Sequence, residues 1–269
     1  MSIIMISRGS FSRGREVAEN VAQKLGYECI ARDVLLEASK EFNVDELKLD
    51  HALRDAPSFF SRLSYGKERY VAYIRAALLE HLKRDNVVYC GLAGQFFVRD
   101  VSHALKVRII SDVEKRVRLV MERDGISERA AISLIKRIDK ERKEWSEQVY
   151  GVDNTDPSLY DMVLQIQKLT VDGAVDIICR AARLQHLQAT DESRRMLEDA
   201  ALAAAVKAIL VEAHPDAEVA SQDGVVYISA KTTETEELRM EEEVRKLARN
   251  IPGVKDIKIQ LHSFIPFGT

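Results

Sequence analysis

The sequence predicts a protein of the α/β class, in which a parallel sheet is wrapped by helices and a smaller α+β module follows. Over residues 1–185, short apolar runs alternate with helical stretches, a pattern typical of a parallel sheet covered by helices. Beyond about residue 190 the order changes to helix, strand, strand, helix, strand. The chain has 269 residues, which suits one large domain or two of ordinary size.

Local patterns define the elements of the first part. The first helix follows a polar loop, carries apolar residues four apart on one face, and ends at Gly26, which suits the left-handed position after a helix. Ser111 and Glu114 have the spacing of a capping box at the start of a later helix. The predicted strands are residues 2–7, 27–31, 86–94, 104–111 and 160–167, and the predicted helices are residues 17–25, 32–42, 44–53, 67–85, 112–125, 126–151 and 171–184.

Two turns organise the C-terminal module. Asp223-Gly224 is a hairpin signal between two short strands, and Pro252-Gly253 ends the last helix before a final strand. No Pro/Gly linker separates the module from the first part, so the junction rests on a change of texture near residues 184–195. The predicted helices of the module are residues 194–214 and 233–251, and its last strand is residues 255–264.

The charge balance argues against large anionic partners. The formal net charge is -3 and 31% of the residues are charged, with mixed sign, so we expect neither nucleic acid nor a membrane as a partner. No apolar segment approaches the roughly 20 residues of a membrane-spanning helix. The first apolar run is short and meets Arg8 at once, which does not fit a secretory signal.

Cysteine and histidine usage gives two further expectations. Cys29, Cys90 and Cys179 are an odd number in apolar segments without a C-x-x-C motif, which indicates reduced thiols in a cytoplasmic protein. The six histidines show no ligand spacing, so we expect no metal site formed by protein ligands.

The stretch "RGSFSRGRE" carries the most informative motif. Gly9 and Gly14 have the spacing of a phosphate-binding loop, G-x-x-x-x-G-K-[ST], with Arg15 in place of the lysine and Glu16 in place of the Ser/Thr. A phosphate requires converging backbone N–H groups, a helix N-terminus and a cation, and this stretch offers all three. The alternative is a strand-turn-helix connection with incidental glycines.

This motif, in the form "ISRGSFSRGREVAENVAQKLG", resembles the first motif of the cytidylate kinase-like family, a branch of the P-loop nucleoside monophosphate kinases. The resemblance continues in "SDVEKRVRLVMERDGISERAAISLIKRIDKERKEWSEQVYGVD" and "YDMVLQIQKLTVDGAVDII", and covers roughly residues 1–183. It implies a P-loop kinase-like parallel sheet of five strands with helices on both faces. It also implies ATP and Mg²⁺ as cofactors and a nucleotide or other small-molecule acceptor.

The resemblance assigns roles to individual residues. Glu16 is expected to hold magnesium through water or to pair with Arg15. The residues expected to bind the nucleotide are Gly9, Ser10, Ser12, Arg13, Gly14, Arg15, Glu16 and Arg116, and the residues expected to be catalytic are Arg15, Arg137, Arg142 and Asp33.

The second motif resembles the lid that closes over the transferring phosphoryl group in such kinases. Arg137, Lys140 and Arg142 lie in a short basic stretch, with Arg116 and Arg118 on the helix before it. Phosphoryl transfer needs positive charge at the equatorial oxygens and exclusion of water, which arginines on a closing helix supply. The alternative is a solvated helix face with ion pairs four residues apart.

The acceptor side departs from the family pattern. Ala31 stands where relatives usually carry an aspartate, and Leu92 stands where they usually carry an arginine. Asp33 could reach the site from a neighbouring position, as could Arg8. Asp33 has a second interpretation as an acidic residue favoured at a helix N-terminus by the dipole.

Residues of about 190–264 resemble a BON domain, on the features of a leading helix, "VASQDGVVYISA" and "ARNIPGVKDIKIQL". We therefore expect two domains, residues 1–187 and 188–269. Apolar positions on the two helices suggest that the module has a private core, namely Leu197, Ala201, Ala205, Leu238, Leu247 and Ile251. The module is expected to sense a ligand or to mediate packing, through a homodimer or a protein partner.

The leading interpretation is ATP-dependent phosphoryl transfer to a nucleoside monophosphate, cytidylate-like, or to a related small acceptor, with a C-terminal regulatory module. The alternative is a nucleotide-binding regulatory protein that has lost acceptor phosphorylation, as Ala31 and Leu92 suggest. Transfer to a non-nucleotide acceptor is a third interpretation.

Overall fold

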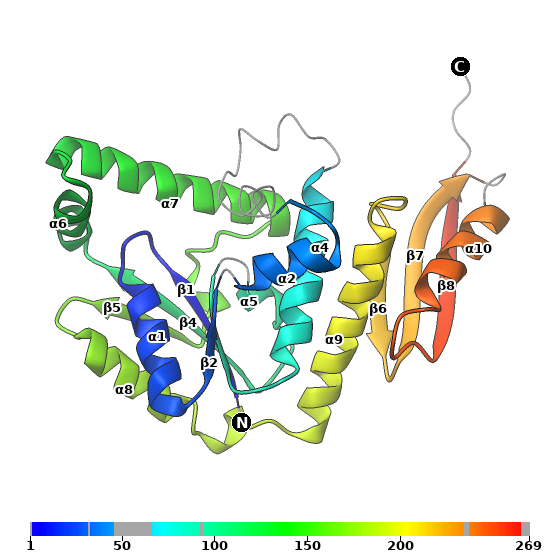
Figure 1. The fold of residues 1–269 in the computed structure, drawn as a ribbon, viewed down its shortest axis with the longest axis horizontal. Coiled ribbons are helices and arrows are strands. Elements are labelled where there is room, and N and C mark those ends of the chain that lie inside the picture. The colour runs from blue at the N-terminus through cyan, green and yellow to red at the C-terminus, as the bar shows by residue number, and fades with distance from the viewer. Residues whose placement is uncertain (1, 32, 46–65, 92–93, 234–236, 265–269) are drawn as a thin grey trace.

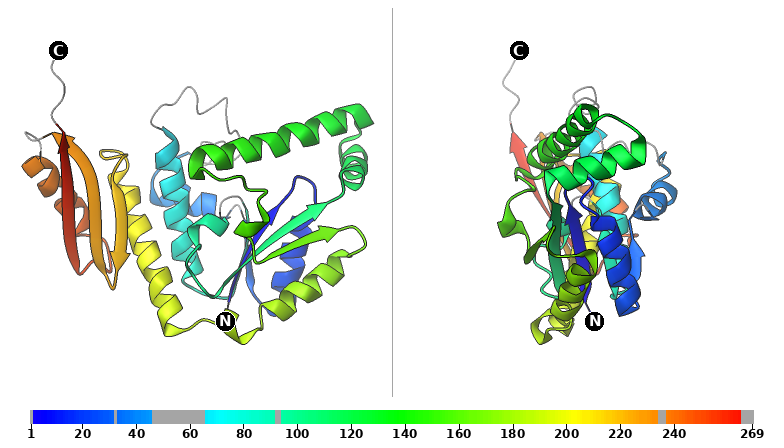
Figure 2. Two further views of the ribbon diagram at one scale, coloured as in Figure 1. Left: turned by 180° about the vertical axis from the view of Figure 1, so that it is seen from behind. Right: turned by 90° about the vertical axis from the view of Figure 1, so that its left-hand side faces the viewer.

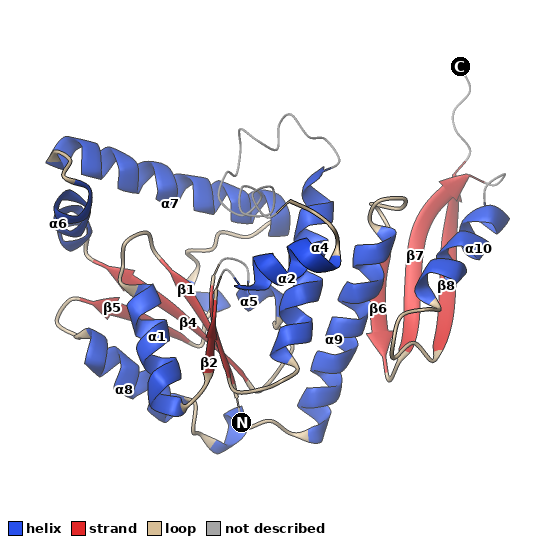
Figure 3. Ribbon diagram, in the orientation of Figure 1, coloured by secondary structure: helices blue, strands red, loops and turns tan. Residues whose placement is uncertain are grey.

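The protein contains two separate sheets joined by helices (Figures 1 and 3). The computed structural model describes residues 2–31, 33–45, 66–91, 94–233 and 237–264. Most of the predicted helix at residues 44–53 lies outside the described residues. Among the described helices, none combines the length and the apolar character needed to cross a membrane.

The first sheet has five parallel strands in the order β2-β3-β1-β4-β5, which confirms the predicted α/β fold. In the central pair, Ser7 of β1 lies opposite Arg108 of β4, and Arg8 lies opposite Ile109. The carboxyl ends of these two strands therefore bring polar side chains to one edge, where ligands of open α/β sheets usually bind. The strands are β1 (Ile3–Arg8), β2 (Glu28–Ile30), β3 (Val87–Cys90), β4 (Ala104–Ser111) and β5 (Met162–Ile166).

Helices cover both faces of this sheet. On one face, α1 (Gly14–Leu25) and α8 (Val171–Ala181) pack over Ile4 and Ile6. On the other face, α2 (Asp33–Glu41), α4 (Gly66–Leu82) and α5 (Gly94–Phe97) pack over Ile3 and Met5. Gly26 ends α1 with φ 70°, as the sequence predicts.

Two helices extend over the carboxyl edge of the strands, α6 (Val113–Asp124) and α7 (Glu128–Tyr150). Helix α7 is the long helix along the top of Figure 1. The predicted capping box at Ser111 is wrong. Asp112 is the N-cap of α6 and accepts from the Glu114 N–H. Ser111 still belongs to β4, and its hydroxyl donates to the Ile166 carbonyl of the neighbouring strand.

The second sheet is small and has the strand order β6-β7-β8. Its strands β6 (Glu218–Gln222) and β7 (Val225–Thr233) are antiparallel, and β8 (Asp256–Phe264) runs parallel to β7. Asp223 and Gly224 have φ of 52° and 82°, so the predicted tight hairpin is confirmed. With α9 (Asp191–Leu210) and α10 (Glu237–Ala248), the order is the predicted helix, strand, strand, helix, strand.

Helix α9 lies between α4 and β6, as Figure 1 and the left view of Figure 2 show. Leu197 and Ala201 belong to the hydrophobic core that contains α4, so the predicted private core is wrong for these positions. Leu238 is 81% exposed and contributes to neither core. The opposite face of α9, with Val206 and Leu210, packs in the core of the small sheet. A helix with two apolar faces therefore connects the two sheets.

Candidate phosphate-binding site

The loop between β1 and α1 is shaped by its backbone. Phe11 and Arg13 have φ of 55° and 61°, and Arg13 is the N-cap of α1. A Cβ on Gly14 would lie 2.7 Å from the Arg8 Cβ, so only glycine allows the helix to begin so close to β1. A Cβ on Gly9 would make only ordinary van der Waals contacts, the nearest at 3.9 Å from the Ser12 Cβ, and the Gly9 N–H donates to the Ile109 carbonyl at 3.0 Å. The second glycine is therefore the one that close packing requires.

Ser12 supports the loop from inside. Its side chain is buried, and its hydroxyl lies 3.0 Å from both the Gly9 and Ile109 carbonyl oxygens. The hydroxyl thus faces the protein, and it ties the loop to β4.

The charged side chains of the loop pair along α1. The Arg13 guanidinium donates to the Glu16 carboxylate at 2.5 and 2.6 Å, and Arg15 Nε donates to Glu19 at 2.7 Å. The predicted pairing of Glu16 with Arg15 is wrong. The backbone of Arg13 is in the left-handed region, and its guanidinium pairs with Glu16 in place of Arg15. Arg15 is 69% exposed and borders an open hollow of about 480 Å³ over the loop.

Asp139 of α7 contacts the loop directly. Its carboxylate accepts from the Ser10 N–H at 3.1 Å, from Ser10 Oγ at 2.6 Å and from Arg116 Nη1 at 2.7 Å. Burial acts to raise the pKa of Asp139, but hydrogen bonds from Ser10 and Arg116 outweigh it and hold this pKa below its ordinary value. An anionic group therefore already occupies donors at the rim of the loop.

Next to this contact is a pocket of about 150 Å³ at the carboxyl ends of β1 and β4. Arg142 Nη1 donates to the Arg8 carbonyl at 3.1 Å. Burial lowers the pKa of Arg142 to about 10, and the positive charges of Arg8 and Arg108 act in the same direction. The arginines that line the pocket are Arg8, Arg108, Arg116 and Arg142, and among the described residues Asp139 is its only acidic lining residue. Such a site attracts anions.

The structure separates the predicted lid residues into two groups. Arg116 and Arg142 line the pocket. Arg137 is 68% exposed and lies 3.8 Å from Glu141, while Lys140 is 74% exposed and lies 3.5 Å from Glu144. The role expected for Arg137 stays a prediction. The other predicted catalytic residue, Asp33, begins α2, and its side chain is outside what the structure describes.

Sequence reasoning did not identify Asp139 or Arg108. The contact of Asp139 with Ser10 joins residues 129 positions apart, and no local pattern reports it. Arg108 could have been found from the sequence, because it is a charged residue among the apolar residues "VRII" at the end of a predicted strand.

The carboxylates near the loop fit magnesium only with the help of a nucleotide. Within the described residues, no group of three or more His, Cys, Asp and Glu is placed to hold a metal ion. Glu16 and Asp139 each accept from an arginine. Magnesium in kinases is bound mostly by substrate phosphates and water, with one or two carboxylates. Glu16 lies in the first turn of α1 and could contribute in this way.

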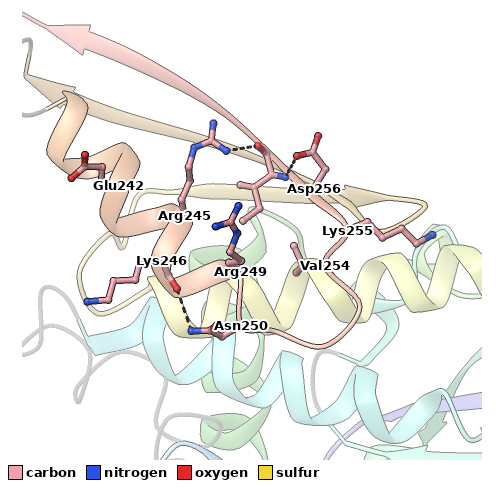
Figure 4. A pocket seen from close by; sticks show the side chains of 9 residues that line it. Glu242, Arg245, Lys246, Arg249, Asn250, Val254, Lys255 and Asp256 are labelled. Carbon is pink, nitrogen blue, oxygen red and sulfur yellow. Dashed lines mark hydrogen bonds between the residues drawn. The ribbon is translucent and has the colours of Figure 1, made fainter.

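A second basic hollow lies on the C-terminal part, between the end of α10 and the start of β8 (Figure 4). It has a volume of about 440 Å³ and is lined by Arg245, Lys246, Arg249 and Lys255 among others. Arg245 donates to the Ile257 carbonyl and to Glu241, so part of this charge is already compensated.

Comparison with known proteins agrees with this geometry. Residues 3–168 match the cytidylate kinase-like family. The cytidylate kinase of Methanopyrus kandleri is 25% identical over 184 residues, which cover 63% of this chain and 85% of that protein. The cytidylate kinase of Archaeoglobus fulgidus is 26% identical over 192 residues, covering 69% and 97%. A crystal structure of an uncharacterized protein from Eubacterium ventriosum has the same fold, with a TM-score of 0.51 and 21% identity, over 68% of this chain and 98% of the other.

Proposed function

The chain belongs to the cytidylate kinase-like family, and we propose that it transfers a phosphoryl group from ATP to a nucleoside monophosphate, cytidylate-like, or to a related small acceptor. The observation that carries this proposal is the position of the arginine pocket directly beside the phosphate loop. Arg8, Gly9 and Arg116 line the pocket, and Arg8 also borders the hollow over the loop.

In this proposal, the ATP phosphates bind over the loop. The N-terminus of α1 supplies backbone N–H groups and a favourable dipole. Among the described residues, the partner of Arg15 is Glu19, in an exposed ion pair, and such pairs are weak, so the guanidinium can turn toward the phosphates. Glu16 would hold, through water, a magnesium ion bound to the nucleotide, and this ion would neutralise part of the phosphate charge.

Arg116 and Arg142 act on the transferring group. Phosphoryl transfer depends mainly on positioning and on positive charge at the equatorial oxygens. Both side chains project from α6 and α7 into the pocket, and both are shielded from water more than Arg137 is. An oxygen of the acceptor attacks the γ-phosphorus, the bond from this phosphorus to the β,γ-bridging oxygen breaks, and ADP leaves.

The regulatory alternative remains a second candidate because Asp139 occupies the Ser10 N–H and Arg116. In a protein that senses ATP, this contact would form without nucleotide and break when ATP binds. Ala31 and Leu92 stand where the family usually carries acceptor-side residues, which fits a loss of phosphoryl transfer. In either case we propose that the BON-like C-terminal part regulates the nucleotide site. Its support is α9, whose two faces pack against α4 and the small sheet.

The test is ADP formation from ATP and Mg²⁺ with CMP, dCMP, UMP, AMP and GMP, followed by small phosphorylated metabolites and non-nucleotide alcohols. Arg142→Ala serves as the inactive control. Acceptor-dependent ADP formation that Arg142→Ala reduces about tenfold or more supports a kinase. Tight ATP binding without transfer to any acceptor supports the regulatory alternative.

A further inference from the structure

Arg108 is a buried charge at the centre of the first sheet. It lies on β4 between Val107 and Ile109, which are fully buried, and it is itself only 8% exposed. Its side chain leaves the sheet on the same face as Ser7, toward the pocket at the carboxyl edge. A charge at such a position is rare in proteins unless it is paired.

All contacts of Arg108 that the structure describes are with neutral groups. Its Nη1 donates to Ser7 Oγ at 3.2 Å and to the Tyr160 hydroxyl at 3.3 Å, and its guanidinium lies 5.5 Å from the centre of the Tyr160 ring. The Tyr160 hydroxyl donates to the Asn154 carbonyl at 2.8 Å, so it is fixed in place. No described carboxylate lies within 4.0 Å of the guanidinium. Arg108 is therefore held firmly without a counter-ion.

The surroundings of Arg108 increase this charge imbalance. Arg8 and Arg142 line the same pocket, whereas the nearby acid, Asp139, binds Arg116 and Ser10. A buried charge without a partner destabilises the folded state. A residue that is costly for the fold and well positioned in a pocket is typical of a functional site.

We propose that Arg108 is a specificity-determining residue that binds the phosphate monoester of the acceptor. This inference rests on the proposed kinase function. The acceptor phosphate would complete the charge balance with Arg108, Arg142 and Arg8, beside the loop that holds ATP. Arg108 would thereby supply, from β4, the positive charge that the family usually places at Leu92.

The test uses the full-length chain and two neutral variants. Arg108→Met removes the charge and keeps a flexible apolar stem, and Arg180→Met is the matched control, because Arg180 is an exposed arginine on α8 with no expected role in the site. Each protein is first saturated with a non-hydrolysable ATP analogue, so that the loop is filled. Inorganic phosphate is then added, and thermal melting and calorimetry report its binding.

We expect Arg108→Met to melt at or above the wild-type temperature in phosphate-free buffer, since it removes an uncompensated buried charge. We also expect it to bind phosphate at least about tenfold more weakly, while Arg180→Met behaves as wild type. A purely structural arginine gives the opposite result, with a lower melting temperature and unchanged phosphate binding. That result, or a wild type that binds no phosphate beside the analogue, overturns the inference.

A second readout separates this inference from the proposed function. In the kinase assay, Arg108→Met should raise the KM of the acceptor about tenfold or more and leave the KM of ATP within about twofold. Failure of wild type to bind the ATP analogue counts against the kinase. Normal turnover with an unchanged acceptor KM in Arg108→Met counts against the role of Arg108 alone.

Discussion

Asp139→Asn should destabilise the free protein and tighten its binding to ATP. In the free protein the Asp139 carboxylate accepts from the Ser10 N–H, Ser10 Oγ and Arg116. Nucleotide phosphates over the loop need the same donors, so Asp139 must leave before they bind. The stabilisation that Asp139 gives the free protein is then subtracted from the binding free energy of ATP.

The magnitude follows from these contacts. A hydrogen bond with a charged partner contributes about 1.5–3 kcal/mol. Asp139 is 37% exposed, so water replaces part of the lost interaction, and the asparagine keeps an oxygen that accepts from Ser10. We therefore expect a net loss of about 1–2 kcal/mol, which lowers Tm by about 2–8 °C and tightens ATP binding about fivefold to thirtyfold.

Calorimetric titration with ATP and thermal melting measure both effects. Asp124→Asn is the control. Asp124 also pairs with an arginine, at the end of α6, and its substitution by asparagine removes the same formal charge. Unchanged or weaker ATP binding in Asp139→Asn would refute the reasoning. Equal tightening in both variants would mean that overall charge, and not the Ser10 contact, is responsible.

The same contact predicts a pH dependence. Because the pKa of Asp139 is lowered in the folded protein, its stabilising contribution is present above the unfolded carboxyl pKa of about 4. This contribution is lost as the pH falls through the lower folded value. Wild type should therefore lose its stability advantage over Asp139→Asn as the pH falls below about 4.

Three further predictions concern the loop, the lid and the domain boundary. Arg15→Ala should weaken ATP binding by about 1.5–3 kcal/mol in calorimetry, with Lys24→Ala at the far end of α1 as the control; equal affinities in folded proteins would contradict this role. Arg142→Ala should lower kcat about tenfold or more, and more than it raises KM, whereas a similar loss in Arg137→Ala would show that the exposed Arg137 reaches the phosphates when the lid closes. Fragment 1–187 should melt lower than fragment 1–214 or aggregate, because it lacks α9 over α4; a fragment 1–187 as stable as the longer one would support a boundary near residue 187.

The fold was predictable wherever local sequence carries its physical cause. The loop follows from Gly14, whose missing Cβ allows α1 to start beside Arg8. The hairpin follows from Asp223-Gly224, which adopts positive φ at both positions. Local sequence patterns do not determine the order of the strands in the sheet, and the five-stranded sheet was expected from the family resemblance.

The candidate site was predictable only in part, because its geometry depends on long-range register. The "KRIDKER" stretch places charged residues around the whole of α7, and only tertiary packing decides that Arg142 faces the pocket and Arg137 faces water. The private core expected for the C-terminal module exists and includes Ala205, Leu247 and Ile251, but two of the expected positions lie outside it for the same reason. Leu197 and Ala201 are apolar in either arrangement, and their partner is decided by the position of α4.

The charges of the site explain how its parts depend on one another. In the part of the chain that the structure describes, four arginines and one acid line this small pocket, and the acid, Asp139, is already bound to Arg116 and Ser10. Burial lowers the pKa of Arg142 most, and repulsion from Arg8 and Arg108 lowers it further. An incoming phosphate relieves this repulsion, and it also releases Asp139 from the loop. Binding of anions on the two sides of Asp139 should therefore be cooperative, since the first anion to bind contributes the free energy that separates α7 from Ser10.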